Sequence, residues 1–124
     1  MLSRTADHVY WLGRYAERAE NLARTLDVQY RLSLVPHASS ADGHGWAQVL
    51  ARLGLDAAFA ERHDSPDPHR VIDFLAFDSG NPSSILSCLR AARENARAVR
   101  GSLTTEVWET HNDTWLGLQR LLRD

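Results

Sequence analysis

The sequence predicts an all-α protein, an up-and-down helical bundle with two long helices and two short bridging helices. Apolar residues recur at steps of three and four along most of the chain, as they do on the buried face of a helix. No stretch alternates convincingly with the period of two that is typical of a strand. At 124 residues, the chain has the size of one domain that buries a core without disulfides or metals, and we expect one domain over residues 1–124.

The first long helix is predicted from about Arg4 to Leu34, a stretch without proline, with Ser3 as its N-cap. Pro36 and the Gly-, Ser- and Asp-rich segment up to residue 45 end this helix in a loop. A short second helix is predicted from Trp46 to about residue 61, with a weak point at its internal glycine, residue 54.

A third, short helix is predicted to start at Asp67 and Pro68, because an acidic cap followed by proline is typical of a helix start. Asn81 and Pro82 repeat this pattern, and they predict a second long helix over residues 82–100. The pair Gly101 and Ser102 is expected to kink or break it. Helical spacing then resumes, and no stop signal follows it, so we expect the chain to end inside a helix.

Two similar charged stripes are the main candidate for a functional site. On a helix, each stripe falls on one face, although this spacing usually belongs to an apolar seam. The candidate residues are Arg14, Glu17, Arg18 and Asn21 in the first stripe and Arg93, Glu94 and Arg97 in the second.

If the two long helices pack antiparallel, we expect Glu17 to meet Arg93 or Arg97, and Glu94 to meet Arg14 or Arg18. Three interpretations stay open: a buried network that fixes the helix register, a ligand-binding or catalytic site, and a solvated face. An Arg cluster with carboxylates could hold an anionic substrate, and a desolvated Glu could act as a general base. No catalytic residue is assigned from the sequence.

Composition argues against several other function classes. Sixteen acids against fourteen bases give a net charge of −2, which does not favour binding to nucleic acid, although the arginines at positions 90, 93, 97 and 100 form a ridge. Cys88 is the single cysteine, so an intrachain disulfide is excluded, and a small buried apolar role is favoured over a nucleophile. The six histidines lack the spacing of metal ligands, so neither a metal nor another cofactor is predicted.

The sequence also predicts where the protein resides. The first residues lack a hydrophobic signal segment, and no run approaches the roughly 18 apolar residues that a bilayer span requires. We therefore expect a cytoplasmic protein that does not interact with membranes.

Six ordered segments together resemble the bacterial Alpha-E family, a predicted helical domain with a recurring Glu-Arg motif. They are residues 2–4 (LSR), 10–21 (YWLGRYAERAEN), 77–78 (FD), 81–85 (NPSSI), 92–97 (ARENAR) and 108–109 (WE). Members of this family are usually much longer, so the resemblance implies that the chain corresponds to the amino-terminal part of such a protein. A bundle truncated at its C-terminal end would expose apolar surface, and self-association is then expected.

The resemblance also implies a cellular role, because genes of this family are often neighbours of, or fused to, genes for ATP-grasp proteins and transglutaminase-like proteases. It implies an accessory or scaffold module of a cytoplasmic system that forms or modifies peptide bonds, with an ATP-grasp-type or transglutaminase-like protein as partner. The alternative is an enzyme or ligand-binding domain that uses the paired Glu/Arg site on an anionic or amide-containing substrate. The residues alone do not decide whether the chain is an enzyme.

Overall fold

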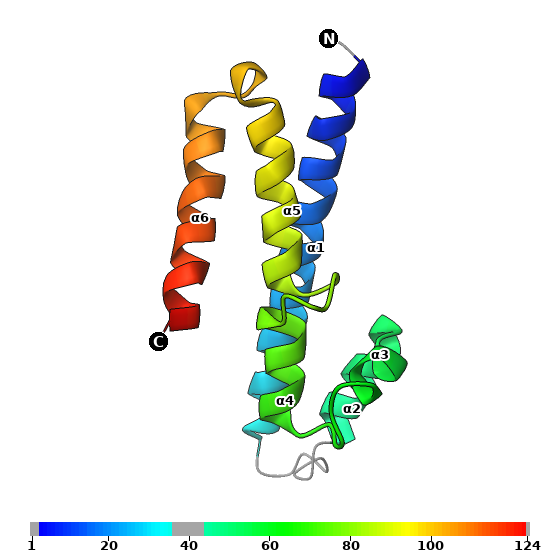
Figure 1. The fold of residues 1–124 in the computed structure, drawn as a ribbon. Helices are drawn as coiled ribbons and strands as arrows, with labels where there is room; N and C mark the ends of the chain where they lie inside the picture. The colour runs from blue at the N-terminus through cyan, green and yellow to red at the C-terminus, as the bar shows by residue number, and fades with distance from the viewer. Residues whose placement is uncertain (1–2, 36–43, 124) are drawn as a thin grey trace.

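The computed structural model describes residues 3–35 and 44–123 (Figure 1), and it is helical throughout these ranges apart from turns and short connections. The prediction of an all-α protein is therefore confirmed. The helices in chain order are α1 (Ser3–Ser33), α2 (His44–Leu53), α3 (Asp56–Ala60), α4 (Pro68–Ile72), the π-helical turn η1 (Asp73–Phe77), α5 (Ile85–Ala98), the 3-10 turn η2 (Arg100–Ser102) and α6 (Thr105–Arg123).

The prediction of two long and two short helices is wrong in number. α6 has 19 residues and is longer than α5, which has 14, so the described chain has three long helices. The single helix expected from Trp46 to residue 61 is divided into α2 and α3. Gly54 lies between them with φ of 72°, a left-handed conformation that glycine adopts at little cost. The loop expected after Pro36 lies outside the described residues up to position 43.

α5 packs between α1 and α6 (Figure 1). His8 Nδ1 lies 2.9 Å from Asn95 Oδ1, although the two residues are 87 positions apart, and this contact fixes where α1 and α5 meet. Further along, Leu12 of α1 shares a buried cluster with Ala92 and Ala96 of α5, both of which are 0% exposed. Residue numbers thus increase along α1 in the direction in which they decrease along α5, so the two helices are antiparallel. The small alanine side chains allow the two backbones to approach closely.

The larger core lies at the other end of α1, where α2, α3 and α4 gather (Figure 1). Trp46 of α2 and Phe74 of η1 are its largest fully buried side chains, and Phe59 of α3 stacks edge-on against Phe74 at 5.3 Å between ring centroids. Leu22 and Leu26 bring α1 into the same cluster. Burial of these side chains holds the short helices against the second half of α1.

The predicted start of the third helix is confirmed in detail. Asp67 is the N-cap of α4, its carboxylate accepts a hydrogen bond from Arg70 N at 3.0 Å, and Pro68 occupies the first turn. α4 then continues directly into the π-helical turn η1, which no feature of the sequence indicated. The wider turn places Phe74, Leu75 and the alanine after them in the core.

The predicted cap of the second long helix is wrong. α5 starts at Ile85 and its N-cap is Ser84, whose hydroxyl oxygen accepts a hydrogen bond from Ser87 N at 3.1 Å. Asn81 lies three residues earlier and is 4% exposed. Its amide donates to Phe74 O at 3.0 Å and accepts from Ser83 N at 3.0 Å. Asn81 therefore joins η1 to the loop before α5 instead of capping a helix.

A salt bridge and a backbone hydrogen bond hold the same loop from its other side. Arg62, which follows α3, forms an ion pair with Asp78, and the carboxylate of Asp78 also accepts from Gly80 N at 2.8 Å. Residues 78–84 are thus fixed against both α3 and η1, which places Ser83 firmly at the start of α5.

The predicted break at Gly101 and Ser102 is confirmed, because α5 ends at Ala98 and the 3-10 turn η2 covers Arg100–Ser102. After this turn, α6 runs back alongside α5 (Figure 1). In the described residues no helix is long and apolar enough to cross a membrane.

Candidate functional site

The two charged stripes do not form the expected network. Among the described residues, the ion pairs of Glu94 are made within α5, at 3.9 Å to Arg93 and 3.7 Å to Arg97. Neither Glu17 nor Arg14 forms an ion pair with α5 in the described part of the chain, and both are exposed. In the part of the chain that the structure describes, the expected pairs of Glu17 with Arg93 or Arg97, and of Glu94 with Arg14 or Arg18, are therefore absent.

The register of α1 on α5 explains this absence. Glu17 lies nine residues beyond His8, and His8 meets Asn95, so Glu17 is level with the part of α5 near Leu86. Arg93 is seven residues further along, which at 1.5 Å per residue is about 10 Å along the helix axis. The same geometry separates Glu94 from Arg18 by a still longer distance. The antiparallel packing that we expected is present, but the stripes are displaced along it.

Three arginines of the ridge, at positions 90, 93 and 100, turn towards α6 instead. Arg93 Nε donates to Asn112 Oδ1 at 3.3 Å, and the guanidinium groups of Arg90 and Arg93 each lie 5.9 Å from the ring centroid of Trp115. Arg100 lies 4.9 Å from the ring of Trp108. The contacts of Arg90 and Arg93 hold α6 on α5, and that of Arg100 joins η2 to α6. They occupy three of the four arginines in the ridge that a nucleic acid would need.

The polar link between α1 and α5 is made by His8 and Asn95. The contact at 2.9 Å is partly buried, and the Asn95 amide also donates to Ala91 O at 2.8 Å. Asn95 directly follows Glu94 in the sequence, so the predicted stripe is adjacent to the residue that contacts His8. His8 was missed, because a single histidine on the polar side of an amphipathic helix gives no signal of its partner.

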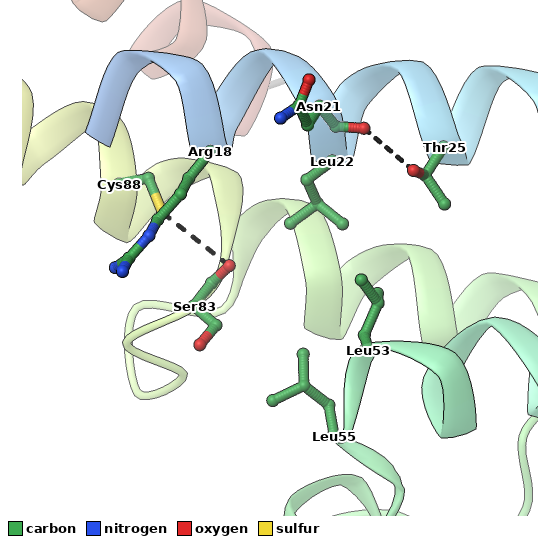
Figure 2. A pocket seen from close by; sticks show the side chains of 8 residues that line it. All are labelled: Arg18, Asn21, Leu22, Thr25, Leu53, Leu55, Ser83 and Cys88. Carbon is green, nitrogen blue, oxygen red and sulfur yellow. Dashed lines mark hydrogen bonds between the residues drawn. The ribbon is translucent and has the colours of Figure 1, made fainter. Parts of the chain in front are cut away.

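The first stripe borders a cavity of about 430 Å³ (Figure 2). Of the predicted site residues, Arg18 and Asn21 lie on its wall, and Arg93, Glu94 and Arg97 do not. The other lining residues come from α1, the α2–α3 turn, and the start of α5 with the loop before it. They are Leu22, Thr25, Leu53, Leu55, Ser83 and Cys88.

The cavity has one polar and one apolar end. In Figure 2 the Arg18 side chain extends from α1 towards Ser83 and Cys88, whereas three leucines converge beside them. The guanidinium of Arg18 also lies 5.5 Å from the centroid of the Tyr15 ring. Thr25 donates its hydroxyl hydrogen to Asn21 O at 2.9 Å, so this hydrogen is already used within α1. Arg18 is therefore the main polar group offered to a ligand.

Cys88 has the properties of a buried thiol and not of a nucleophile. It is 2% exposed, and its Sγ lies 3.9 Å from Ser83 O. Burial raises the pKa of the Cys88 thiol above its ordinary value, and the positive charge of Arg18 offsets only part of this increase. The thiol is accordingly protonated at neutral pH, which agrees with the small apolar role that the sequence favoured.

The histidines do not form a metal centre in the described residues, where no group of three or more His, Cys, Asp or Glu side chains could hold an ion. His63 stacks on Phe59 at 4.7 Å between centroids and completes the edge of the core. His111 is partly buried on α6, and its desolvation lowers its pKa. His37 lies outside the described residues.

The fold and the cavity together define an all-helical protein in which the Glu-Arg segment of a long first helix borders an open cavity. The sequence profile of the Alpha-E family, described as a predicted α-helical domain with a conserved ER motif, matches residues 1–124. The chain belongs to this family. It contains two Glu-Arg dipeptides: the first ends in Arg18 at the cavity, and the second ends in Arg62, which pairs with Asp78.

The chain is also similar to uncharacterised mycobacterial proteins. One from Mycobacterium bovis is 30% identical over 132 aligned positions, and proteins from the CDC 1551 and H37Rv strains of Mycobacterium tuberculosis are 30% and 29% identical. In each case the alignment covers 97% of this chain but 14% of the relative. The chain thus spans about a seventh of the length of these relatives. No solved structure matches it.

Proposed function

We propose that this protein is an accessory or scaffold helical module of a cytoplasmic system that forms or modifies peptide bonds, and that it binds an ATP-grasp-type protein. The observation that carries a binding role is the set of large apolar side chains that α6 leaves exposed. The chemistry of the partner comes from the family resemblance, which associates such domains with ATP-grasp proteins and with transglutaminase-like proteases.

Four large apolar side chains of α6 are left exposed. They are Val107 (39%), Leu116 (48%), Leu121 (64%) and Leu122 (39%). Trp108 and Trp115 already hold α6 on α5. Val107 and Leu121 lie on a different face of the helix from these two rings, so they are not needed for that contact. Exposed apolar side chains that gather on one helix are typical of a surface that another protein covers.

The described residues give little support to a catalytic role. The Cys88 thiol is buried and its pKa is raised. Glu17 and Glu94 are exposed, and they are too far from the arginines of the opposite stripe to form a paired acid–base site. A binding module therefore accounts for more of the structure than the alternative of an enzyme with a paired Glu/Arg site.

The proposal is tested by mixing the purified protein with an ATP-grasp-type protein from the same genome and measuring the complex by calorimetry. We expect the double variant Val107→Glu/Leu121→Glu to weaken the complex at least tenfold, because these two exposed side chains lie on nearly the same face of α6 and the variant places two charges where the partner would bind. The matched control is Leu34→Glu, which alters a leucine at the end of α1 that is as exposed as Leu121. It should leave the affinity unchanged.

Two results would contradict the proposal. One is the absence of any complex with the wild-type protein, and the other is an equal loss of affinity in the Leu34→Glu control. Sedimentation of the protein alone tests whether a second copy of this chain covers the same exposed residues of α6. If the α6 patch instead joins two copies of this chain, the double variant converts a concentration-dependent dimer to a monomer and no ATP-grasp complex forms.

The arrangement of the long helices supports the same role. We propose that α1, α5 and α6 are part of an up-and-down bundle, in which α6 presents its uncovered side to a neighbour. In such a bundle every helix normally buries apolar residues on two or more sides, whereas α6 is packed only against α5 among the elements that contact it strongly. The exposed leucines are the surface that a further helix or a partner protein would cover.

A further inference from the structure

The cavity beside α1 has features that the docking role of α6 does not use. Its wall carries one formal charge, the guanidinium of Arg18, and no carboxylate. Arg18 forms no ion pair with an acid anywhere in the described residues, although Arg24 on the same helix pairs with Glu20 at 2.7 Å. A guanidinium has five N–H donors, and those of Arg18, which lines the cavity and is exposed, remain available to a ligand.

The other side of the cavity is apolar. Leu53 and Leu55 flank the turn between α2 and α3, and Leu22 faces them from α1 (Figure 2). Leu53 is 40% exposed, which leaves its side chain accessible to a ligand. Gly54 between the two leucines adopts the left-handed conformation that creates this turn. The apolar wall is thus built by a defined backbone feature.

We propose that this cavity binds a small carboxylate with an apolar body, such as the end of a peptide or an N-acyl amino acid. The carboxylate lies on Arg18, which can donate two parallel N–H···O bonds to it, and Ser83 lines the same cavity. The apolar body rests on Leu22, Leu53 and Leu55. One guanidinium beside a protonated Cys88 thiol matches a single negative charge, and this favours a carboxylate over a phosphate dianion.

This ligand site is independent of the docking surface on α6, because none of its lining residues belongs to that helix. It also differs from the paired site expected from the sequence. The arginine of the first stripe is retained, but its partners are a serine of the 78–84 loop and three leucines instead of the acids and arginines of α5. The two proposals can therefore fail or succeed separately.

N-acetyl-leucine is a direct probe, and N-acetyl-leucinamide is its uncharged control. We expect calorimetry to show saturable binding of the acid and at least tenfold weaker binding of the amide. Arg18→Gln should weaken binding of the acid by a similar factor and leave the affinity for the amide unchanged. Arg14→Gln is the matched control, because it removes the same charge from an exposed position of α1 outside the cavity.

A second measurement locates the apolar part of the ligand. Methyl NMR signals of Leu53 and Leu55 should shift on titration with N-acetyl-leucine, and Leu53→Ala should weaken binding severalfold. Far-UV circular dichroism checks that Arg18→Gln and Leu53→Ala remain folded, which we expect because both residues are exposed. If the tripeptide N-acetyl-Ala-Ala-Leu binds with equal affinity, the natural ligand is the end of a peptide. If the tripeptide does not bind, the ligand is a free N-acyl amino acid.

Three results would overturn the proposal. The first is no saturable binding of N-acetyl-leucine by the wild-type protein up to its solubility limit. The second is equal loss of affinity in Arg18→Gln and Arg14→Gln, which would indicate general charge attraction. The third is competition by inorganic phosphate at the same concentration as the carboxylate, which would show that the site does not select a monoanion with an apolar body.

Discussion

Replacement of Asn81 by alanine tests the role of the loop that positions Ser83. The side-chain amide of Asn81 donates to Phe74 O and accepts from Ser83 N, each at 3.0 Å. In Asn81→Ala both hydrogen bonds disappear. The Phe74 carbonyl belongs to a residue that is 1% exposed, so water cannot readily replace the lost donor, whereas Ser83 is exposed and its N–H can bond to water.

These two environments set the size of the expected effect. An unsatisfied buried carbonyl costs about 1–3 kcal/mol, and a hydrogen bond that water replaces contributes about 1 kcal/mol. Together they predict that Asn81→Ala lowers the free energy of unfolding by about 2–4 kcal/mol. Asn81→Asp should be no less damaging, because it keeps the acceptor for Ser83 N but places a carboxylate oxygen against the Phe74 carbonyl.

Urea denaturation followed by circular dichroism measures the effect. With a slope of about 1–3 kcal/mol per molar urea, the Asn81→Ala midpoint should fall by roughly 1 M or more. Ser79→Ala is the matched control, because Ser79 is an exposed residue of the same loop. A loss of less than about 1 kcal/mol in Asn81→Ala, or a loss equal to that of the control, would refute the reasoning from burial.

Four further outcomes follow from the structure. Glu94→Gln should change the unfolding free energy by less than about 1 kcal/mol, because its ion pairs are exposed, whereas a double-mutant cycle between His8 and Asn95 should show coupling of about 0.5–1.5 kcal/mol. Gly54→Ala should cost about 1–2 kcal/mol in urea denaturation, because its φ of 72° disfavours a side chain although the space is open. Desolvation lowers the pKa of His111 in the folded protein, so its contribution to the free energy of unfolding is fully present above the unfolded-state pKa near 6.5. This contribution is lost as the pH decreases through the folded-state pKa. Unfolding free energies measured from pH 8 to pH 5 should therefore fall less in His111→Gln than in the wild type.

Local signals in the sequence predicted most of the helices. Asp67 and Pro68 marked a helix start that the structure reproduces, and Gly101 marked a break. Asn81 followed by proline gave the same signal, but Ser84 became the cap instead. The reason is tertiary: burial of Asn81 beside Phe74 satisfies a carbonyl of η1, and a sequence pattern does not show which distant backbone group needs a partner.

The sequence predicted the part of the candidate site that lies on α1 but not the part contributed by the rest of the chain. The register of α5 along α1 explains this difference. Arg18 and Asn21 could be placed on one face of α1 from their spacing alone, and that face does border a cavity. The pairing of this face with Glu94 depended on how far α5 slides along α1. Packing of Leu12 against the small, fully buried side chains of Ala92 and Ala96 sets that distance, because this cluster is the apolar contact that α1 and α5 share. Since burial of these apolar residues outweighs exposed ion pairs worth at most about 1 kcal/mol, the charges follow the register and do not determine it.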